Sequence, residues 1–272
     1  MSFIYNSNTL VKVNRISNNE VTSECTKLSN KLEMTAWIII DTYTFAIKRA
    51  GWAIYCSPKD ITGHFELPQL IGMTAYLNSG AQLKKLLGGE ENETVRELIA
   101  DCIRGIVQSE IFLLPERGYK NYTHYHGKWE QMYVDSCLYY SHLDTVPKVS
   151  MYEGDRNRTY NLFNRTKMVN ITHEENGDYT VTASFTDCYH QLNIFLVLNP
   201  AGVVLESYGN FTRAHYNICF QNSHLLAKLK GFVLGQMTKK EIASLAGGSN
   251  GCDHMVSLLY ETSRVLREAL PL

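Results

Sequence analysis

The chain has 272 residues, of which 44% are hydrophobic and 19% are charged, and its formal net charge is −1 at pH 7. This length predicts one large or two medium domains, and the composition excludes disordered and fibrous proteins. Because the charge is nearly balanced, there is no electrostatic basis for binding nucleic acid or an anionic membrane, and we expect neither partner.

The N-terminal stretch MSFIYNSNTLVKV lacks the basic start and apolar core of a signal peptide, and no apolar run reaches the ~18 residues that span a bilayer. We therefore expect a cytoplasmic protein. In a reducing compartment an odd number of scattered cysteines predicts thiols or metal ligands instead of a disulfide framework. The seven cysteines are Cys25, Cys56, Cys102, Cys137, Cys188, Cys219 and Cys252.

Three ungapped stretches of the first half recur in the same order in the second half. They begin at residues 4 and 162, 21 and 181, and 68 and 227, so that the separation stays between 158 and 160 residues. Three weak matches at one spacing favour duplication over two unrelated halves with coincidental glycines. We predict a degenerate first copy over residues 1–150 and a second copy over 155–272, with a polar linker at Tyr152–Arg158.

The first copy is expected to run from strands to helices and to end in a helix at Thr94–Ile111. A tail that has no counterpart in the second copy follows at Pro115–Pro147 and is dense in tyrosine and histidine. If its aromatic segment 119–142 is exposed, it is suited to bind a protein partner or a second copy of the chain. If it is buried between the halves, it is a clasp. Four residues of the tail are of types that can bind a metal: His124, His126, Cys137 and His142. In such a loop, packing and solvent contact are the commoner roles of these residues.

The second copy has the clearer pattern. Alternating and apolar runs predict antiparallel strands at Lys167–Ile171, Tyr179–Phe185, Leu192–Leu198 and Val203–Leu205, with turns at Glu175–Asp178 and Asn199–Gly202. Helical periodicity follows at Ser223–Leu234, Thr238–Leu245 and Met255–Leu270, with Thr238 as an N-cap. This order predicts an α+β fold: a tandem repeat of two similar domains related by a pseudo-two-fold, each an antiparallel meander followed by helices.

A glycine-rich loop before the last predicted helix carries the main candidate site. Gly247, Gly248 and Gly251 allow the backbone to fold tightly over a bound group, and they are the candidate cofactor-binding residues. Cys252 falls at the helix N-terminus, where free N–H groups and the macrodipole are expected to lower its pKa and favour a nucleophile or a metal ligand. Residues i and i+2 do not share a helix face, so Cys252 and His254 can converge only if Cys252 lies outside the helix.

Further candidate ligands lie upstream: Asp187 and His190 in a predicted turn between strands, and Cys219 where a helix is predicted to open. Cysteine, histidine and carboxylate ligate zinc and iron, so Cys219, Cys252 and His254 with Asp187 or His190 would form a tetrahedral site. The alternative is structural: a small buried cysteine, a core histidine and a turn-forming aspartate. The repeat favours the site, because Lys27, Asn30, Glu93 and Val95 occupy the aligned positions of Asp187, His190, Cys252 and His254 in the first copy. Cys219 matches Cys56, but only through a short gap.

On these residues the second half, roughly Leu162–Leu270, resembles a bacterial family known as domain of unknown function 2889. The shared features are Asp187 and His190, an R-x-x-Y-x-x-C segment at Arg213–Cys219, and a closing GG-x-x-GC-x-H-[LM] motif at Gly247–Met255. The resemblance implies no established activity. A more distant similarity to iron–sulfur scaffold proteins of the IscU and NifU type implies a SufE/NifU-like fold. The chain departs from those scaffolds, because it lacks GCGSA around Cys219, has Cys-x-His in place of an adjacent His-Cys pair, and has no strand-region cysteine unless Cys188 substitutes.

Three functions are therefore open, and the sequence does not decide whether the protein is an enzyme. The first is a metal-binding protein for zinc, iron or an iron–sulfur centre, with the site in the second copy. The second is a cysteine-dependent enzyme for a small acyl or persulfide substrate, with Cys252 as nucleophile and His254 or His190 as base. The third is a non-catalytic interaction protein that binds through Tyr119–Tyr140. Walker, Rossmann and nucleophile-elbow motifs are absent from the sequence.

Overall fold

A computed structural model describes residues 1–59, 61–89, 92–146 and 158–270, so most of the linker predicted at 152–158 lies outside the described residues. The chain divides into two compact units. The N-terminal unit comprises Thr9–Gly127 and Asp155–Arg165, and the C-terminal unit comprises Met1–Asn8, Lys128–Gly154 and Thr166–Leu272. The domain boundaries predicted from the internal repeat refer to two copies of a duplicated domain and not to compact units of the structure. They remain a prediction.

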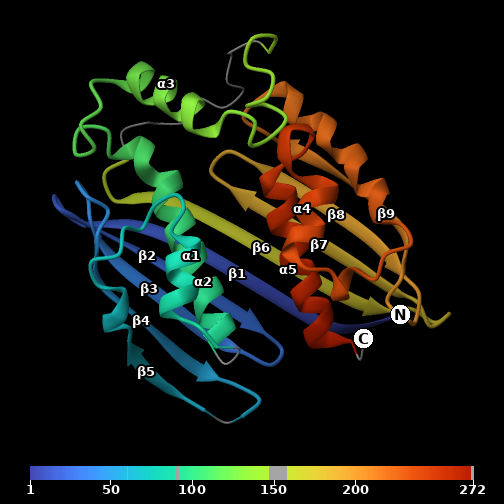
Figure 1. The fold of residues 1–272 in the computed structure, drawn as a ribbon. Coiled ribbons are helices and arrows are strands. Elements are labelled where there is room, and N and C mark those ends of the chain that lie inside the picture. The colour runs from blue at the N-terminus through green and yellow to red at the C-terminus, as the bar shows by residue number, and fades with distance from the viewer. Residues whose placement is uncertain (60, 90–91, 147–157, 271–272) are drawn as a thin grey trace. The chain divides into compact units, whose positions relative to one another are not determined.

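The N-terminal unit contains five strands in the order β5-β4-β3-β2-β1, with helices after them in sequence (Figure 1). Its elements are β1 (Ser2–Ser17), β2 (Glu20–Ser29), β3 (Glu33–Asp41), β4 (Ile47–Cys56), β5 (Gly63–Glu66), the 3₁₀ helix η1 (Pro68–Leu70), α1 (Gly80–Leu86), α2 (Glu93–Ser109) and η3 (Glu110–Phe112). Helix α2 packs on β2 and β3, where Ser23 Oγ donates to Cys102 O at 3.0 Å. Gly105 allows this close packing, because a Cβ there would lie 2.9 Å from Val11 and Val13.

The C-terminal unit has its strands in the order β6-β7-β8-β9, and the β7–β8 and β8–β9 pairs are antiparallel. Its elements are β6 (Asn161–His173), β7 (Tyr179–Asp187), β8 (Gln191–Leu198), β9 (Val204–Arg213), η4 (Asn217–Leu229), η5 (Leu234–Gln236), α4 (Lys239–Ala246), η6 (Gly248–Asn250) and α5 (Asp253–Ala269). Strands β1 and β6 each contribute residues to both units. Helix α3 (Tyr122–Tyr133) lies in the tail.

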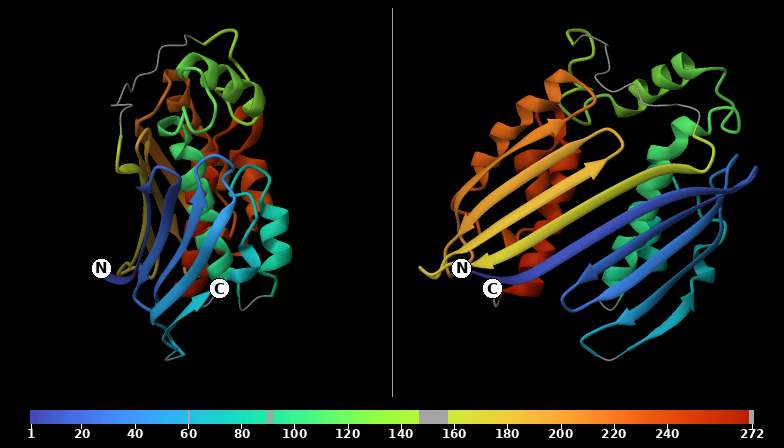
Figure 2. Two further views of the ribbon diagram at one scale, coloured as in Figure 1. Left: turned by 90° about the vertical axis from the view of Figure 1, so that its left-hand side faces the viewer. Right: turned by 180° about the vertical axis from the view of Figure 1, so that it is seen from behind.

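In each unit, taken by itself, the helices lie on one face of the strands, as the view from behind shows (Figure 2). In β7 the residues Val181, Ala183, Phe185 and Asp187 are buried in alternation, so they form the row that faces the helices. Helix α5 packs on β7 with an apolar stripe that includes Leu258, Leu259, Val265 and Leu266. Asp187 therefore ends a row of core residues and lies on the helix side.

The predicted helix starts are confirmed at α4 and α5, but the first predicted helix is wrong in type. Thr238 caps α4: its Oγ1 accepts from Glu241 N at 3.3 Å, and Glu241 Oε2 accepts from Thr238 N at 2.7 Å. The first part of the segment predicted as a helix at Ser223–Leu234 belongs to the 3₁₀ helix η4, which ends at Leu229, and residues 230–233 are not helical. In η4 the Asn222 and Ser223 side chains donate to carbonyls three residues earlier, which competes with regular α-helical bonding.

The α+β class is confirmed, and the two units share several local features. Gly72 and Gly231 both have positive φ, at 83° and 89°, and each N–H donates at 2.8 Å to a residue at the start of a strand, Ile47 or Val204. Helices α2 and α5 both have 17 residues. In the described part of the chain, no helix combines the length and the apolar character that crossing a bilayer requires.

A buried carboxylate holds the start of the tail in the N-terminal unit. Glu110 is fully buried and accepts from Tyr76 Oη at 2.6 Å and from Arg117 Nε at 2.9 Å. The Arg117 guanidinium also lies 4.0 Å from the centre of the Phe45 ring. Burial and the neighbouring Glu110 raise the pKa of Tyr76, so the phenol stays protonated and serves as a donor.

Glu110→Gln is expected to lower the free energy of unfolding by about 2 kcal/mol, because it leaves the Arg117 charge uncompensated in a mostly buried place. The matched control is Glu66→Gln, which breaks an exposed pair with Arg49 and should change stability by less than about 0.5 kcal/mol. Urea unfolding followed by circular dichroism measures both values. Equal destabilisation by the two variants would show that the buried cluster contributes no more than a surface pair.

Candidate metal centre

A tight turn at the end of β7 positions two of the predicted ligands. The turn joins Asp187 to His190, and Asp187 N donates to His190 O at 2.9 Å. Asp187 Oδ1 accepts from the N–H groups of Tyr189 and His190 at 2.8 and 2.7 Å. Arg213, at the end of β9, donates from Nη2 to Asp187 O at 2.5 Å. The turn-forming role of Asp187 is therefore real, and it fixes the carboxylate next to the His190 side chain.

The first turn of α5 brings the third ligand to the same place. Cys252 is the N-cap and has extended backbone angles, so α5 begins after it and His254 lies in the first turn. The His254 and His190 rings stack with centroids 3.9 Å apart and an interplanar angle of 28°. Phe185 packs edge-on against His254, with ring centroids 5.2 Å apart.

Asp187, His190 and His254 form a candidate metal site, because one ligand atom from each lies within 4.8 Å of the other two. His190 Nδ1 is 3.3 Å from Asp187 Oδ1, and His254 Nε2 is 4.0 Å from Asp187 Oδ2. The exposed fractions of the side chains are 0% for Asp187, 11% for His190 and 25% for His254, so the site opens to solvent on the side of His254.

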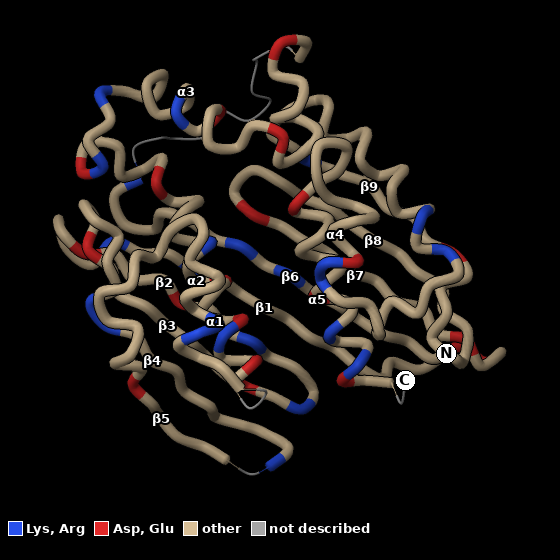
Figure 3. Tube along the Cα trace, in the orientation of Figure 1, with Lys and Arg blue, Asp and Glu red and all other residues tan. Residues whose placement is uncertain are grey.

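The electrostatics of the site favour a cation. Asp187 is the one charged residue of β7, and β8 has none, so the tube along β8 is tan in Figure 3. A buried carboxylate is stabilised by nearby positive charge. The Arg213 guanidinium, which donates to Asp187 O, supplies part of it, and a metal ion bound by the carboxylate would add to it. Two neutral imidazoles and one carboxylate are the ligands that catalytic zinc and non-haem iron(II) sites use, with positions left open for water or substrate.

The predicted cysteine ligands lie outside this group. Cys252 is next to it, with Sγ 3.8 Å from His254 Nδ1, which is the imidazole nitrogen that does not face Asp187. Cys219, in η4, does not belong to the group of three that is found in the described part of the chain. The sequence analysis therefore named all three residues of this group as candidates, with Asp187 and His190 as alternatives for one ligand position, and it placed both thiols in the same coordination sphere.

The expectation that the helix terminus lowers the pKa of Cys252 is wrong in sign. Burial raises the pKa of Cys252 well above its ordinary value, and the opposing hydrogen bonds from the N–H groups of Met255 and His254 do not offset it. Burial likewise raises the pKa of Cys219 to about 11. Desolvation of a thiolate outweighs the helix dipole when the sulfur lies inside the protein.

This raised pKa predicts slow alkylation of Cys252. In metal-free protein at pH 7.5, iodoacetamide should modify the exposed Cys56 first and Cys252 much later, because little of the Cys252 thiol is ionised at that pH. Peptide mass spectrometry over a time course gives the order of modification. Labelling of Cys252 as fast as that of Cys56 would contradict the assignment of a buried, protonated thiol.

The glycine loop folds against the chain itself. Gly248 has φ 72°, and a Cβ on Gly251 would lie 2.3 Å from Ala246 O and 2.5 Å from Gly247 O. This close approach lets Cys252 N donate to Ala246 O at 2.8 Å, which sets where α5 begins. The glycines thus place Cys252 and His254, and their predicted contact with a cofactor stays a prediction.

The tail contributes residues that the sequence did not assign to the site. Lys128–Gly154 belongs to the C-terminal unit, where Leu138 N donates to Gly251 O at 2.9 Å. The ring of Tyr139 stacks on that of Tyr216, with centroids 3.6 Å apart and planes 5° apart. In the sequence, the high density of tyrosine was the one signal that this part of the tail packs, and it did not indicate which residues the tail packs against. Elsewhere in the tail Met132 and Val134 are exposed, and the predicted protein partner stays a prediction.

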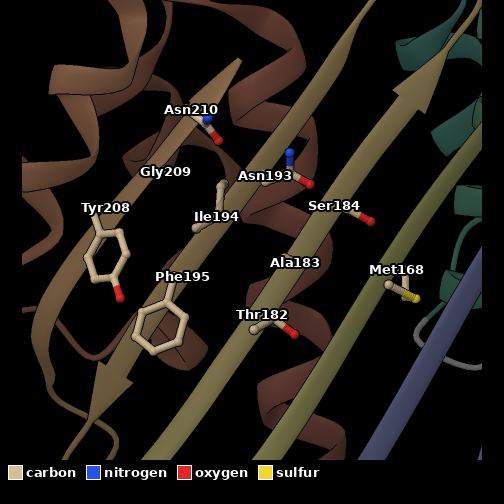
Figure 4. A pocket seen from close by; sticks show the side chains of 10 residues that line it. All are labelled: Met168, Thr182, Ala183, Ser184, Asn193, Ile194, Phe195, Tyr208, Gly209 and Asn210. Carbon is tan, nitrogen blue, oxygen red and sulfur yellow. The ribbon is translucent and has the colours of Figure 1, made fainter. Parts of the chain in front are cut away.

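A cavity of about 370 Å³ on the other face of the C-terminal strands is a separate feature (Figure 4). Phe195 and Tyr208 stack at one end of it, with ring centroids 4.7 Å apart. Its other polar lining residues are Thr182, Ser184, Asn193 and Asn210. Because histidine, cysteine and carboxylate are all missing from the lining, this cavity does not offer the chemistry of the metal site.

The fold and the site define an α+β protein with a candidate metal centre of one aspartate and two histidines. Residues 163–267 match the family described as protein of unknown function (DUF2889), which confirms the family resemblance of the second half. This match contains Asp187, His190, Cys219, Cys252 and His254. No curated protein and no solved structure matches the chain, so the similarity to iron–sulfur scaffold proteins has no support from these comparisons.

Proposed function

We propose that the C-terminal unit is a metal-binding domain that holds one divalent zinc or iron ion through Asp187, His190 and His254. The observation that carries this proposal is the convergence of their ligand atoms within 4.8 Å. Metal–ligand bonds of about 2.0–2.1 Å place neighbouring ligand atoms about 3.3 Å apart, so small side-chain rotations are enough to close the site. Three protein ligands leave a position for water or substrate, as in catalytic metal sites.

The proposal includes a duplicated origin, in which the first copy has lost its site. Residues Lys27, Asn30 and Val95 occupy the aligned positions of Asp187, His190 and His254, and none of them can reproduce this ligand set. The shared order of strands, short helices and a 17-residue last helix supports a common ancestry. The first copy then serves structure or assembly, and the metal chemistry is confined to the second.

Metal analysis of protein made without a histidine tag tests the proposal. We expect about one equivalent of zinc, or of iron under anaerobic conditions, in the native protein and in the control His224→Gln, which alters an exposed histidine. His190→Gln and His254→Gln should each weaken binding by more than tenfold, because a ligand is lost. Equal metal content in all four proteins, or none in the native protein, would refute a metal centre at this place.

One observation favours a second candidate, a cysteine-dependent enzyme. His254 lies between a thiol and a carboxylate, with Nδ1 3.8 Å from Cys252 Sγ and Nε2 4.0 Å from Asp187 Oδ2. This is the order of nucleophile, base and orienting acid in cysteine acyl transfer. Incubation of the metal-free protein with a small activated thioester, followed by intact mass measurement, tests it. Acylation of Cys252 breaks the substrate C–S bond and releases a free thiol, so thiol release or an acyl mass that Cys252→Ser lacks supports the enzyme, and the absence of both contradicts it.

A further inference from the structure

A row of polar side chains lines one side of the cavity on the face of the C-terminal strands that is turned away from the helices (Figure 4). The strand register places Ser184 opposite Asn193, and Asn193 opposite Asn210. Side chains in such opposite positions lie about 5 Å apart on one face of a sheet. Ser184 and Asn193 are half-buried and Asn210 is exposed, so one hydroxyl and two amides offer both donors and acceptors of hydrogen bonds.

Two aromatic rings form the neighbouring row of the same cavity. Phe195 lies opposite Tyr208, two residues along β8 and β9 from the asparagine pair. Their rings stack with centroids 4.7 Å apart and planes 26° apart. Figure 4 shows both rings with a face toward the viewer, on the side away from the helices. Because Tyr208 is 55% exposed, the pair presents a flat apolar surface to solvent.

Thr182 continues the aromatic row onto β7, where a chain of amides holds it. It lies opposite Phe195 in the strand register. Its Oγ1 accepts from Asn170 Nδ2 at 3.4 Å, and Asn170 Oδ1 accepts from Asn6 Nδ2. Since the Thr182 oxygen serves as an acceptor, its O–H group can donate to a ligand. Hydrogen-bonding groups therefore lie both beside the two rings and at their β7 end.

The lining also restricts the charge of a ligand. Among the described residues that line the cavity, none is charged. A phosphate or carboxylate would lose hydration here without a cation to compensate for it. A wholly apolar ligand would cover the amides of Asn193 and Asn210 without giving them hydrogen bonds, which is also costly. The lining fits a neutral molecule that is apolar on one face and carries hydroxyl groups at its edge.

We propose that this cavity binds a neutral saccharide, with one sugar ring packed on Phe195 and Tyr208. The C–H groups of a pyranose gather on one side of the ring and carry a slight positive charge, so the electron-rich face of an aromatic ring attracts them. The sugar hydroxyls donate and accept, as do the amides of Asn193 and Asn210. The volume of about 370 Å³ suits a small ligand. This site does not depend on the metal centre, because the two share no residue.

Isothermal titration calorimetry of the full chain with cellobiose, maltose and N,N′-diacetylchitobiose tests the proposal. We expect at least one of these neutral disaccharides to bind, and Tyr208→Ala to weaken that binding by about tenfold or more, because the stacking surface is lost. Tyr208→Phe keeps the ring and should stay within about threefold of the native affinity. Asn193→Ala should weaken binding through lost hydrogen bonds. Tyr43→Ala is the matched control and should bind as the native protein does, because Tyr43 is also 55% exposed but lies in the N-terminal unit.

The saccharide site is overturned if the native protein binds none of the three disaccharides, or if Tyr208→Ala and Asn193→Ala both bind them with native affinity. Tighter binding of digalacturonate, whose carboxylates are charged, would overturn the neutral class of ligand. A dimer that Tyr208→Ala dissociates in analytical ultracentrifugation, without disaccharide binding, would show that a second copy covers this face instead. Near-ultraviolet circular dichroism shows whether each variant keeps its fold, and Asn193→Ala keeps the test decisive if Tyr208→Ala unfolds.

Discussion

Gly251→Ala is expected to destabilise the C-terminal unit by about 2–3 kcal/mol. A Cβ at this position would lie 2.3 Å from Ala246 O and 2.5 Å from Gly247 O, and both atoms belong to backbone that cannot rotate away. Relief of the clash would shift the loop and break the bond from Cys252 N to Ala246 O, which fixes the start of α5. The variant should therefore also displace His254 and weaken metal binding.

Gly80→Ala is the control for the glycine variant. Gly80 begins α1, and a Cβ there would meet no atom within 4 Å. Alanine should leave stability unchanged or raise it by up to about 1 kcal/mol, because alanine is the better helix former. Urea unfolding of both variants and the native protein provides the comparison. If Gly251→Ala is as stable as Gly80→Ala, the tight loop is not a requirement of the fold.

Asp187→Asn is expected to lower the affinity for zinc or iron(II) by more than about 100-fold, while stability changes by less than about 1 kcal/mol. The amide oxygen of asparagine can still accept from the N–H groups of Tyr189 and His190, so the turn is kept. What is lost is the carboxylate charge and its strength as a ligand. Isothermal titration calorimetry measures the affinity, and urea unfolding measures the stability.

Asp41→Asn is the matched control, because Asp41 ends β3 in the same kind of turn. Its Oδ1 accepts from the N–H groups of Tyr43 and Thr44 at 3.1 and 3.0 Å, but among the residues that the structure describes no histidine pair joins it in a ligand group. We expect native metal affinity in this variant. If Asp41→Asn and Asp187→Asn bind metal equally well, Asp187 acts as a turn former alone.

Local patterns predicted most of the second-half fold. Alternation along Tyr179–Phe185 and the apolar run Leu192–Leu198 correspond to β7 and β8, and Thr238 caps α4 as expected. These signals succeed because each depends on residues close in sequence. The sequence pattern did not predict that η4 is a 3₁₀ helix. Hydrogen bonds from the Asn222 and Ser223 side chains compete with α-helical backbone bonds, and hydrophobic periodicity carries no information about this competition.

For the candidate site, the choice of ligand residues agreed with the structure better than the predicted properties of the thiols did. Asp187, His190 and His254 were chosen from ligand type and from the repeat, and they do converge. The acidity of Cys252 was misjudged because the burial of its thiol depends on the packed core, which no local motif reveals. The place of Cys137 depends on a bond between Leu138 and Gly251, residues more than a hundred positions apart, and a single sequence carries no signal for such a contact.

The most direct test of the metal centre is anomalous X-ray scattering from crystals grown with zinc. We expect a peak within about 2.2 Å of a carboxylate oxygen of Asp187 and of one nitrogen each of His190 and His254. A map with no peak at this place, or with zinc bound instead by tail residues such as His124 and His126, would contradict a metal centre formed by the turn after β7 and the first turn of α5.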